Sequence, residues 1–233
     1  RGEIEVLADA ILRLDASGRI EMVAKPGTDA HAALAAAPDL IVVPQDRFVI
    51  PGLVDLHVHA PQYPQLGQAL DVPLEVWLGK YTLPLEARYA DLDFARERYE
   101  VLVADLLAAG TTTALYFATQ HLKATELLAE ICLAKGQRGL VGKVAMDDPA
   151  ACPDYYRDAS AAEAVADTRA LIDFVRALRG NDRVLPVITP RFVPSCTDEA
   201  LTGLGALAAE TGAHVQTHCS ESDWAHGHAL ERY

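Results

Sequence analysis

The sequence predicts an α/β fold: a (β/α)8 TIM-type barrel, here incomplete at about five strands, with a small N-terminal β-sandwich domain. From residue 51 onward, apolar strand-like runs alternate with amphipathic helical patterns, which is typical of a parallel sheet. The first of these strands is not followed by the GxGxxG turn of a doubly wound dinucleotide-binding sheet. Polar residues instead gather where the strands are expected to end, which favours a barrel, because barrel enzymes carry their chemistry at the carboxyl ends of strands.

Residues 1–50 are expected to form the N-terminal β-sandwich part. Three of their segments are rich in strand-forming residues: EIEVLADAILRLD, GRIEMVA and LIVVPQDRFVI. The residues ASG at 16–18 supply a turn between the first two segments. The barrel part is expected to follow over residues 51–233.

Five strands and three helices account for most of the barrel part. The expected strands are 53–59, 112–117, 139–146, 184–189 and 214–218. One helix is predicted to stop at Gly110, and another to begin at a capping box formed by Ser160 and Glu163. A third is predicted between Thr197 and Gly212.

Composition restricts the class of protein and its partners. The 233 residues are 51% hydrophobic, enough for a sizeable core, and no apolar stretch is long enough to span a bilayer. The formal net charge of −13, with no cluster of basic residues, argues against nucleic acid and membrane partners. The four cysteines show no CxxC spacing, so we expect free thiols and a cytoplasmic location.

Two motifs suggest a metal site. The segment LVDLHVHAPQYPQ places His57 and His59 on the same side of a strand end, where their rings can share one cation. The segment HVQTHCSESDW adds His218 at another strand end and Glu221 three residues later, a carboxylate that can move protons beside a metal ion. Each motif alone is equally compatible with hydrogen-bonding histidines and a solvated glutamate. Their occurrence at two strand ends of one expected barrel favours the metal site.

The same segments resemble a known family. PGLVDLHVHAPQYPQ is similar to the first-strand signature of the amidohydrolase superfamily. Further segments, in this order, resemble the guanine deaminases within it: PLEVWLGKYTLPLEARYAD, GTTTALYFAT, TPRFVPSC and THCSESDW. The resemblance runs from about residue 51 to the end of the sequence, and it implies zinc-dependent hydrolysis of guanine to xanthine and ammonia.

The resemblance also implies roles for individual residues. It implies that Glu221 is the catalytic proton shuttle. It also implies that three histidines are the metal ligands: His57, His59 and His218. Gln62, Arg191 and Phe192 are expected to bind the purine: an amide for its polar edge, a donor for its carbonyl oxygen, and a ring for its face. Outside the resemblance, Arg191 would be interpreted as a surface ion-pair residue and Phe192 as core.

The resemblance further implies one zinc ion per subunit, with iron as the alternative, and a homodimer. The family pattern adds a histidine and an aspartate from later strands, which this sequence lacks, so we expect the chain to be an N-terminal portion of such a protein. Two alternatives remain open. The first is another aminohydrolase that acts on a different purine or pyrimidine ring. The second is a non-catalytic metal-binding fragment.

Overall fold

The computed structural model describes residues 3–233, and the chain divides into two units, Arg1–Pro51 and Gly52–Tyr233. In the first unit, β1 (Ile11–Leu14) pairs antiparallel with β2 (Ile20–Ala24). The predicted turn joins them, and the Asp15 carboxylate accepts a hydrogen bond from the Ser17 amide at 2.8 Å. Helix α1 (Asp29–Ala35) follows, capped by the Thr28 hydroxyl.

The expected β-sandwich is not confirmed, because the described residues of this unit contain one two-stranded sheet. The strand expected at 40–50 is wrong, since these residues form no strand. Ile41, Val42 and Phe48 are 87%, 77% and 82% exposed. A strand is stabilised by pairing with a neighbour, and this segment pairs with neither β1 nor β2.

The second unit is a parallel sheet in which strands alternate with helices. Its strands are β3 (Leu53–His59), β4 (Thr111–Phe117), β5 (Arg138–Gly142), β6 (Val144–Ala145), β7 (Leu185–Pro190) and β8 (His214–Val215). Neighbours pair in parallel in the order β3, β4, β5 and β7, and both β6 and β8 also pair with β7. This arrangement is α/β and is consistent with part of a (β/α) barrel.

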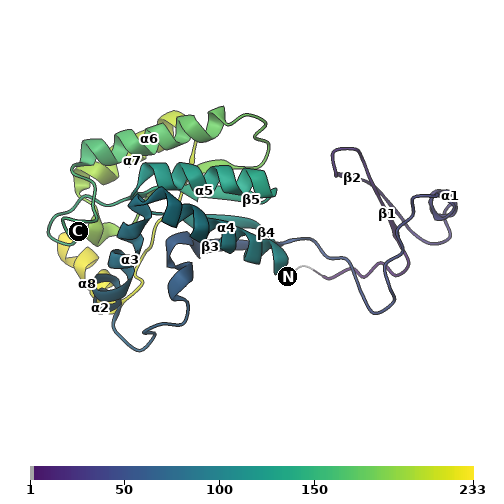
Figure 1. Ribbon diagram of the computed structural model, residues 1–233, viewed down its shortest axis with the longest axis horizontal. Helices are drawn as coiled ribbons and strands as arrows, with labels where there is room; N and C mark the ends of the chain where they lie inside the picture. The colour runs from purple at the N-terminus through teal and green to yellow at the C-terminus, as the bar shows by residue number, and fades with distance from the viewer. Residues whose placement is uncertain (1–2) are drawn as a thin grey trace. The chain divides into compact units, whose positions relative to one another are not determined.

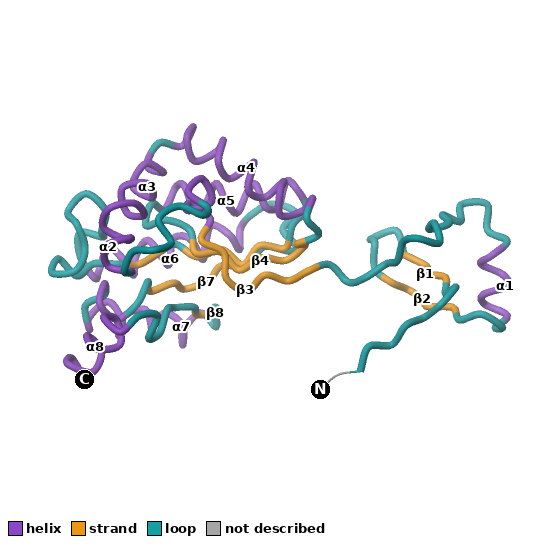
Figure 2. The backbone as a smooth tube through the Cα atoms, turned by 90° about the horizontal axis from the view of Figure 1, so that it is seen from below, coloured by secondary structure: helices purple, strands orange, loops and turns teal. Residues whose placement is uncertain are grey.

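The long helices lie along the sheet. They are α4 (Leu92–Ala108), α5 (Leu122–Lys135), α6 (Ala161–Ala177) and α7 (Asp198–Thr211), and each packs on the next in chain order (Figure 1). Figure 2 shows α4 and α5 along the same side of strands β3 and β4. The side chains of Tyr99, Leu102, Tyr116, Leu128 and Leu171 form part of the buried core between helices and sheet. This packing fixes the strands whose ends carry the polar residues.

Shorter helices connect the strands to these long helices. They are η1 (Ala60–Gln65), α2 (Leu74–Trp77), the π-helical turn η2 (Leu78–Thr82), α3 (Leu83–Ala87), η3 (Arg88–Ala90), η4 (Val193–Ser195) and α8 (Asp223–Arg232). Within residues 3–233 no helix combines the length and the apolar character that crossing a membrane requires.

Several predicted helix ends are confirmed by their caps. The Ser160 hydroxyl accepts a hydrogen bond from the Glu163 amide at 3.2 Å and begins α6. Thr197 caps α7 in the same way, and Gly212 ends that helix with a φ of +65°, a conformation that glycine adopts without steric cost. The local signals for starting and stopping a helix therefore act here as they do in other proteins.

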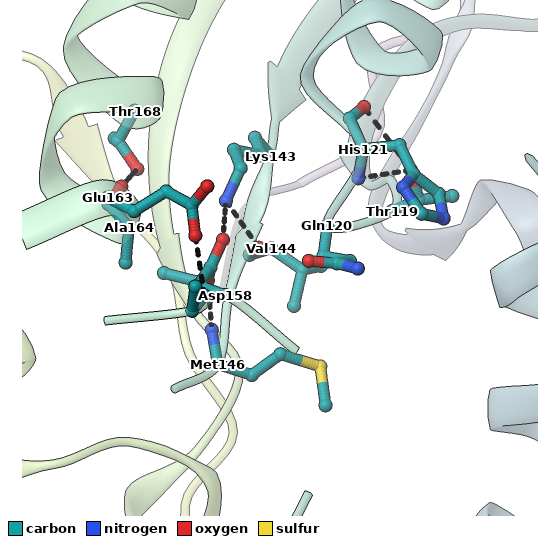
Figure 3. Close-up of polar contacts among 12 residues, drawn as sticks. Thr119, Gln120, His121, Lys143, Val144, Met146, Asp158, Glu163, Ala164 and Thr168 are labelled. Carbon is teal, nitrogen blue, oxygen red and sulfur yellow. Dashed lines mark hydrogen bonds and ion pairs between the residues drawn. The ribbon is translucent and has the colours of Figure 1, made fainter. Parts of the chain in front are cut away.

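The predicted 139–146 strand is interrupted at Lys143, which separates β5 from β6. The side chains of Lys143 and Asp158 point toward one another (Figure 3), with Nζ 2.5 Å from Oδ1, and they are 0% and 2% exposed. The other oxygen of Asp158 accepts a hydrogen bond from the Met146 amide at 2.8 Å. Burial raises the pKa of Asp158, and the Lys143 ammonium opposes this shift. The ion pair thus connects the end of β5 to the loop before α6.

We expect Lys143→Met to lower the free energy of unfolding by about 3–5 kcal/mol, because the Asp158 carboxyl group would stay buried without its partner. Urea denaturation of the intact protein measures the change. The control is Lys123→Met, since that lysine is exposed and its pair with Glu126 is worth about 0–1 kcal/mol. Equal losses in the two variants would contradict a special contribution from the buried pair.

Candidate metal centre and adjoining cleft

Three histidine side chains meet at the carboxyl end of the sheet. His57 and His59 come from β3, and His218 follows β8. The Nε2 atom of His218 lies 3.0 Å from that of His59 and 3.2 Å from that of His57. Their potential ligand atoms all lie within 4.8 Å of one another. The structure therefore brings together the three histidines that the sequence predicts as metal ligands.

Neighbouring groups orient the His218 ring. A carbonyl oxygen only accepts hydrogen bonds, so the 2.7 Å contact with the Arg191 carbonyl means that Nδ1 of His218 carries the hydrogen. In the neutral ring, Nε2 then has a free lone pair, which faces the other two histidines. The Phe117 ring packs against His218 with centroids 4.3 Å apart, and against His59 at 4.9 Å. These contacts fix the orientations of the His218 and His59 rings.

The surroundings of His59 and His218 favour the neutral form of these two rings. Burial lowers the pKa of His59 well below 6.5, and the positive charge of Arg191 and the other two histidines lower it further. Burial also lowers the pKa of His218, although the hydrogen bond to the Arg191 carbonyl and the charge of Glu221 oppose the shift. Neutral imidazole is the form that binds metal ions. Three imidazole nitrogens fit zinc with one coordination position left open, and they also suit iron.

A cleft of about 250 Å³ adjoins the three rings. All seven residues singled out in the sequence line it, together with three from the α2 and η2 segment: His57, His59, His218, Gln62, Arg191, Phe192 and Glu221, then Leu74, Trp77 and Leu78. Another cleft, of about 330 Å³, is lined by residues such as Arg176 and His214. His214 begins β8, so this second cleft lies toward the opposite end of that strand from the histidine cluster.

Glu221 reaches the cleft after a sharp bend of the chain. Ser220 has a φ of +52°, in the left-handed region that residues other than glycine seldom adopt. The side chain of Glu221 is exposed and has no hydrogen-bond partner in the described part of the chain. Strained backbone is common at functional sites. The bend places Glu221 in the lining of the cleft that the three histidines also border.

The main residue that sequence reasoning missed is Glu86. It is completely buried and accepts hydrogen bonds from Gln62 at 2.8 Å, Tyr156 at 2.9 Å and Arg191 at 2.7 Å. One sequence signal was available: Thr82, Leu83, Glu86 and Tyr89 are spaced as one buried helix face. A glutamate within such a face is unusual, because buried acidic groups need partners.

Comparison with known proteins agrees with this geometry. The sequence profile of the amidohydrolase family matches residues 48–233. The chain is 38% identical to guanine deaminase from Dictyostelium discoideum over 235 residues, covering 95% of this chain and 51% of the relative. The chain spans about half the length of the curated relatives it matches.

Two solved structures are informative about ligands. One is the crystal structure of guanine deaminase from C. acetobutylicum with guanine bound in its active site. It has a TM-score of 0.84 and 35% identity, covering 96% of this chain and 51% of that chain. The other is an adenosine deaminase from Xanthomonas campestris with bound zinc, with a TM-score of 0.66 and 25% identity over 78% of this chain and 39% of that one. Both share the fold of this chain over the parts that they cover.

Proposed function

The chain belongs to the amidohydrolase family, and from that premise we propose that the intact protein hydrolyses guanine to xanthine and ammonia with the help of zinc. One observation carries the proposal. The Nε2 atom of His218 lies 3.0 Å from that of His59 and 3.2 Å from that of His57, on the wall of a cleft that Gln62, Arg191 and Glu221 also line. Guanine deaminases among the relatives, one of them with bound guanine, support the choice of substrate.

His57, His59 and His218 would hold the metal ion. A zinc ion bound there supplies hydroxide at neutral pH, because zinc lowers the pKa of water to about 7. The zinc bound to the similar adenosine deaminase supports this metal, and the single histidine cluster in the described part of the chain supports one ion per subunit. Iron is the alternative that the same donors accept.

Glu221 acts as the proton shuttle. Its exposed carboxylate lines the cleft beside His218 and is not engaged in a hydrogen bond among the described residues. It takes one proton from the attacking water and delivers it to the ring nitrogen, and it then takes the proton of the hydroxyl group formed on the purine carbon and delivers it to the leaving amine. The exchange leaves the carboxylate in its original state after each turnover.

Gln62, Arg191 and Phe192 hold the purine. The Arg191 guanidinium, only 3% exposed, donates to the carbonyl oxygen of guanine, and the amide of Gln62 binds the polar edge of the ring. The Phe192 ring packs at the cleft and offers a flat apolar surface. A buried donor left unpaired is costly, so the site discriminates against bases without that oxygen.

Three further features of the intact protein belong to the same proposal. The open parallel sheet is the first part of a (β/α)8 barrel, the protein is a homodimer, and it works in the cytoplasm. The order of parallel strands supports the first of these, and the homodimer stays a prediction from the family resemblance of the sequence. Free cysteines support the third.

A panel of bases tests the proposed substrate. The zinc-loaded intact protein is expected to release ammonia from guanine and to form xanthine in equal amount, and to deaminate adenine and cytosine at least about 1,000-fold less efficiently. Ammonia and base products are measured together by enzymatic assay and chromatography. Efficient turnover of another base in place of guanine would assign the protein to a different aminohydrolase. Zinc binding without turnover of any base would identify a non-catalytic metal-binding protein.

A further inference from the structure

We propose that Glu86 is a positioning residue that sets the hydrogen-bonding character of the cleft, so that it accepts a neutral base carrying a carbonyl group next to a ring N–H. Such an edge is the lactam edge of 6-oxopurines. The inference rests on the proposed function and deepens it, because it identifies what selects the substrate class.

Glu86 connects two cleft residues that come from distant parts of the chain. Its Oε1 accepts hydrogen bonds from Gln62 at 2.8 Å and from Nη2 of Arg191 at 3.2 Å. Its Oε2 accepts from Nη1 of Arg191 at 2.7 Å and from the Tyr156 hydroxyl at 2.9 Å. The glutamate lies on α3, whereas Gln62 lies on η1 and Arg191 directly follows β7. Four hydrogen bonds to one buried carboxylate fix the relative positions of these three elements.

The paired contact with Glu86 determines the net charge and the free N–H donors that Arg191 offers to a ligand. Burial lowers the pKa of Arg191, but the Glu86 carboxylate more than offsets this effect, so the guanidinium remains charged. An unpaired buried cation would attract an anionic ligand, whereas this cation is already neutralised by the carboxylate. The two contacts use two of the five N–H groups of arginine. Those that remain are suited to a neutral acceptor such as a carbonyl oxygen.

Glu86 also determines which end of the Gln62 amide is available. An ionised carboxylate only accepts hydrogen bonds, so the Gln62 atom at 2.8 Å is the amide nitrogen. The same nitrogen lies 3.0 Å from Nδ1 of His59. The Gln62 carbonyl oxygen makes no hydrogen bond among the described residues and is left as an acceptor for a ring N–H. A donor on Arg191 and an acceptor on Gln62 together complement the C=O and N–H groups of a lactam.

Glu86→Gln in the intact, zinc-loaded protein tests this role. The variant keeps the shape of the side chain but removes the charge and two acceptor positions. We expect the KM for guanine to rise about tenfold or more, with a smaller change in kcat, and the preference for guanine over 2-aminopurine to fall about tenfold. 2-Aminopurine lacks the carbonyl oxygen, so its binding depends less on Arg191. Zinc content is expected to stay unchanged. Glu126→Gln, at a mostly buried glutamate on α5 away from the cleft, is the matched control and is expected to leave both values unchanged.

A double variant separates positioning from a general structural effect. If Glu86 acts through Arg191, Glu86→Gln is expected to change the guanine KM by a smaller factor when Arg191→Gln is already present than in the wild type, and the remaining effect is the part that Glu86 exerts through Gln62. If Glu86→Gln alone fails to fold, the double variant, which leaves neither charge of this pair buried alone, is expected to show the same lowered preference for guanine over 2-aminopurine. Independent effects that multiply in the double variant would overturn the inference, as would an unchanged guanine preference in Glu86→Gln. No guanine turnover by the wild-type protein would instead overturn the proposed function, and this inference with it.

Discussion

Replacing His218 with alanine is expected to remove both zinc binding and turnover. His57 and His59 both belong to β3, and His218 supplies the third imidazole of the cluster. Its Nε2 atom lies 3.0 Å from that of His59 and 3.2 Å from that of His57. Two remaining imidazoles make an incomplete site, so we expect zinc affinity to fall by more than about 100-fold, beyond the loss seen when only a supporting residue is removed. Metal analysis after dialysis against a weak chelator measures the retained zinc.

His214→Ala is the control for this prediction. His214 is exposed and begins β8, four residues before His218 on the same segment, and it lies outside the histidine cluster. The control is expected to keep its zinc and its activity. Retention of one zinc ion per subunit by His218→Ala would show that the metal is held elsewhere in the protein.

Glu221→Gln is expected to lower kcat for guanine by about 100- to 10,000-fold, because the amide has the size of the carboxylate but cannot take up a proton. Zinc content should stay close to that of the wild type, because Glu221 does not belong to the group of three histidines. The affinity for guanine should also stay close to that of the wild type, because Arg191 pairs with Glu86 and not with Glu221. Single-turnover kinetics and metal analysis check the two expectations. Glu231→Gln, at an exposed position of α8, supplies the matched control. A kcat within tenfold of the wild type would assign the proton transfer to another group.

Local sequence patterns predict much of this fold. The strand at Leu53–His59 has the predicted limits, and α6 and α7 begin at the predicted caps, because capping and strand termination depend on nearby residues. The break in the predicted strand occurs at Lys143, whose partner Asp158 lies fifteen residues away, so no local pattern predicts it. The apolar segment at 40–50 looks like a strand for the same local reasons, but strand formation needs a pairing partner elsewhere.

In the candidate site, too, features set by nearby residues are predictable from the sequence, whereas features set by distant partners are not. The spacing of His57 and His59 is local, and His218 joins them because parallel strands bring their carboxyl ends to one edge. Glu86 is different, since its partners Gln62 and Arg191 lie 24 and 105 residues away. In the sequence, its helical spacing with Thr82, Leu83 and Tyr89 is the one local signal, and this spacing does not identify the partners of an acidic residue for which solvent exposure is the ordinary expectation. Only the folded chain shows that its carboxylate is buried among donors.

The most direct test of the account is the zinc dependence of guanine deamination by the intact protein. Metal-free protein is expected to form no xanthine, and one equivalent of zinc per subunit is expected to restore equal formation of xanthine and ammonia. Zinc-saturated protein that leaves guanine unchanged, or metal-free protein that converts it at the full rate, would contradict the account.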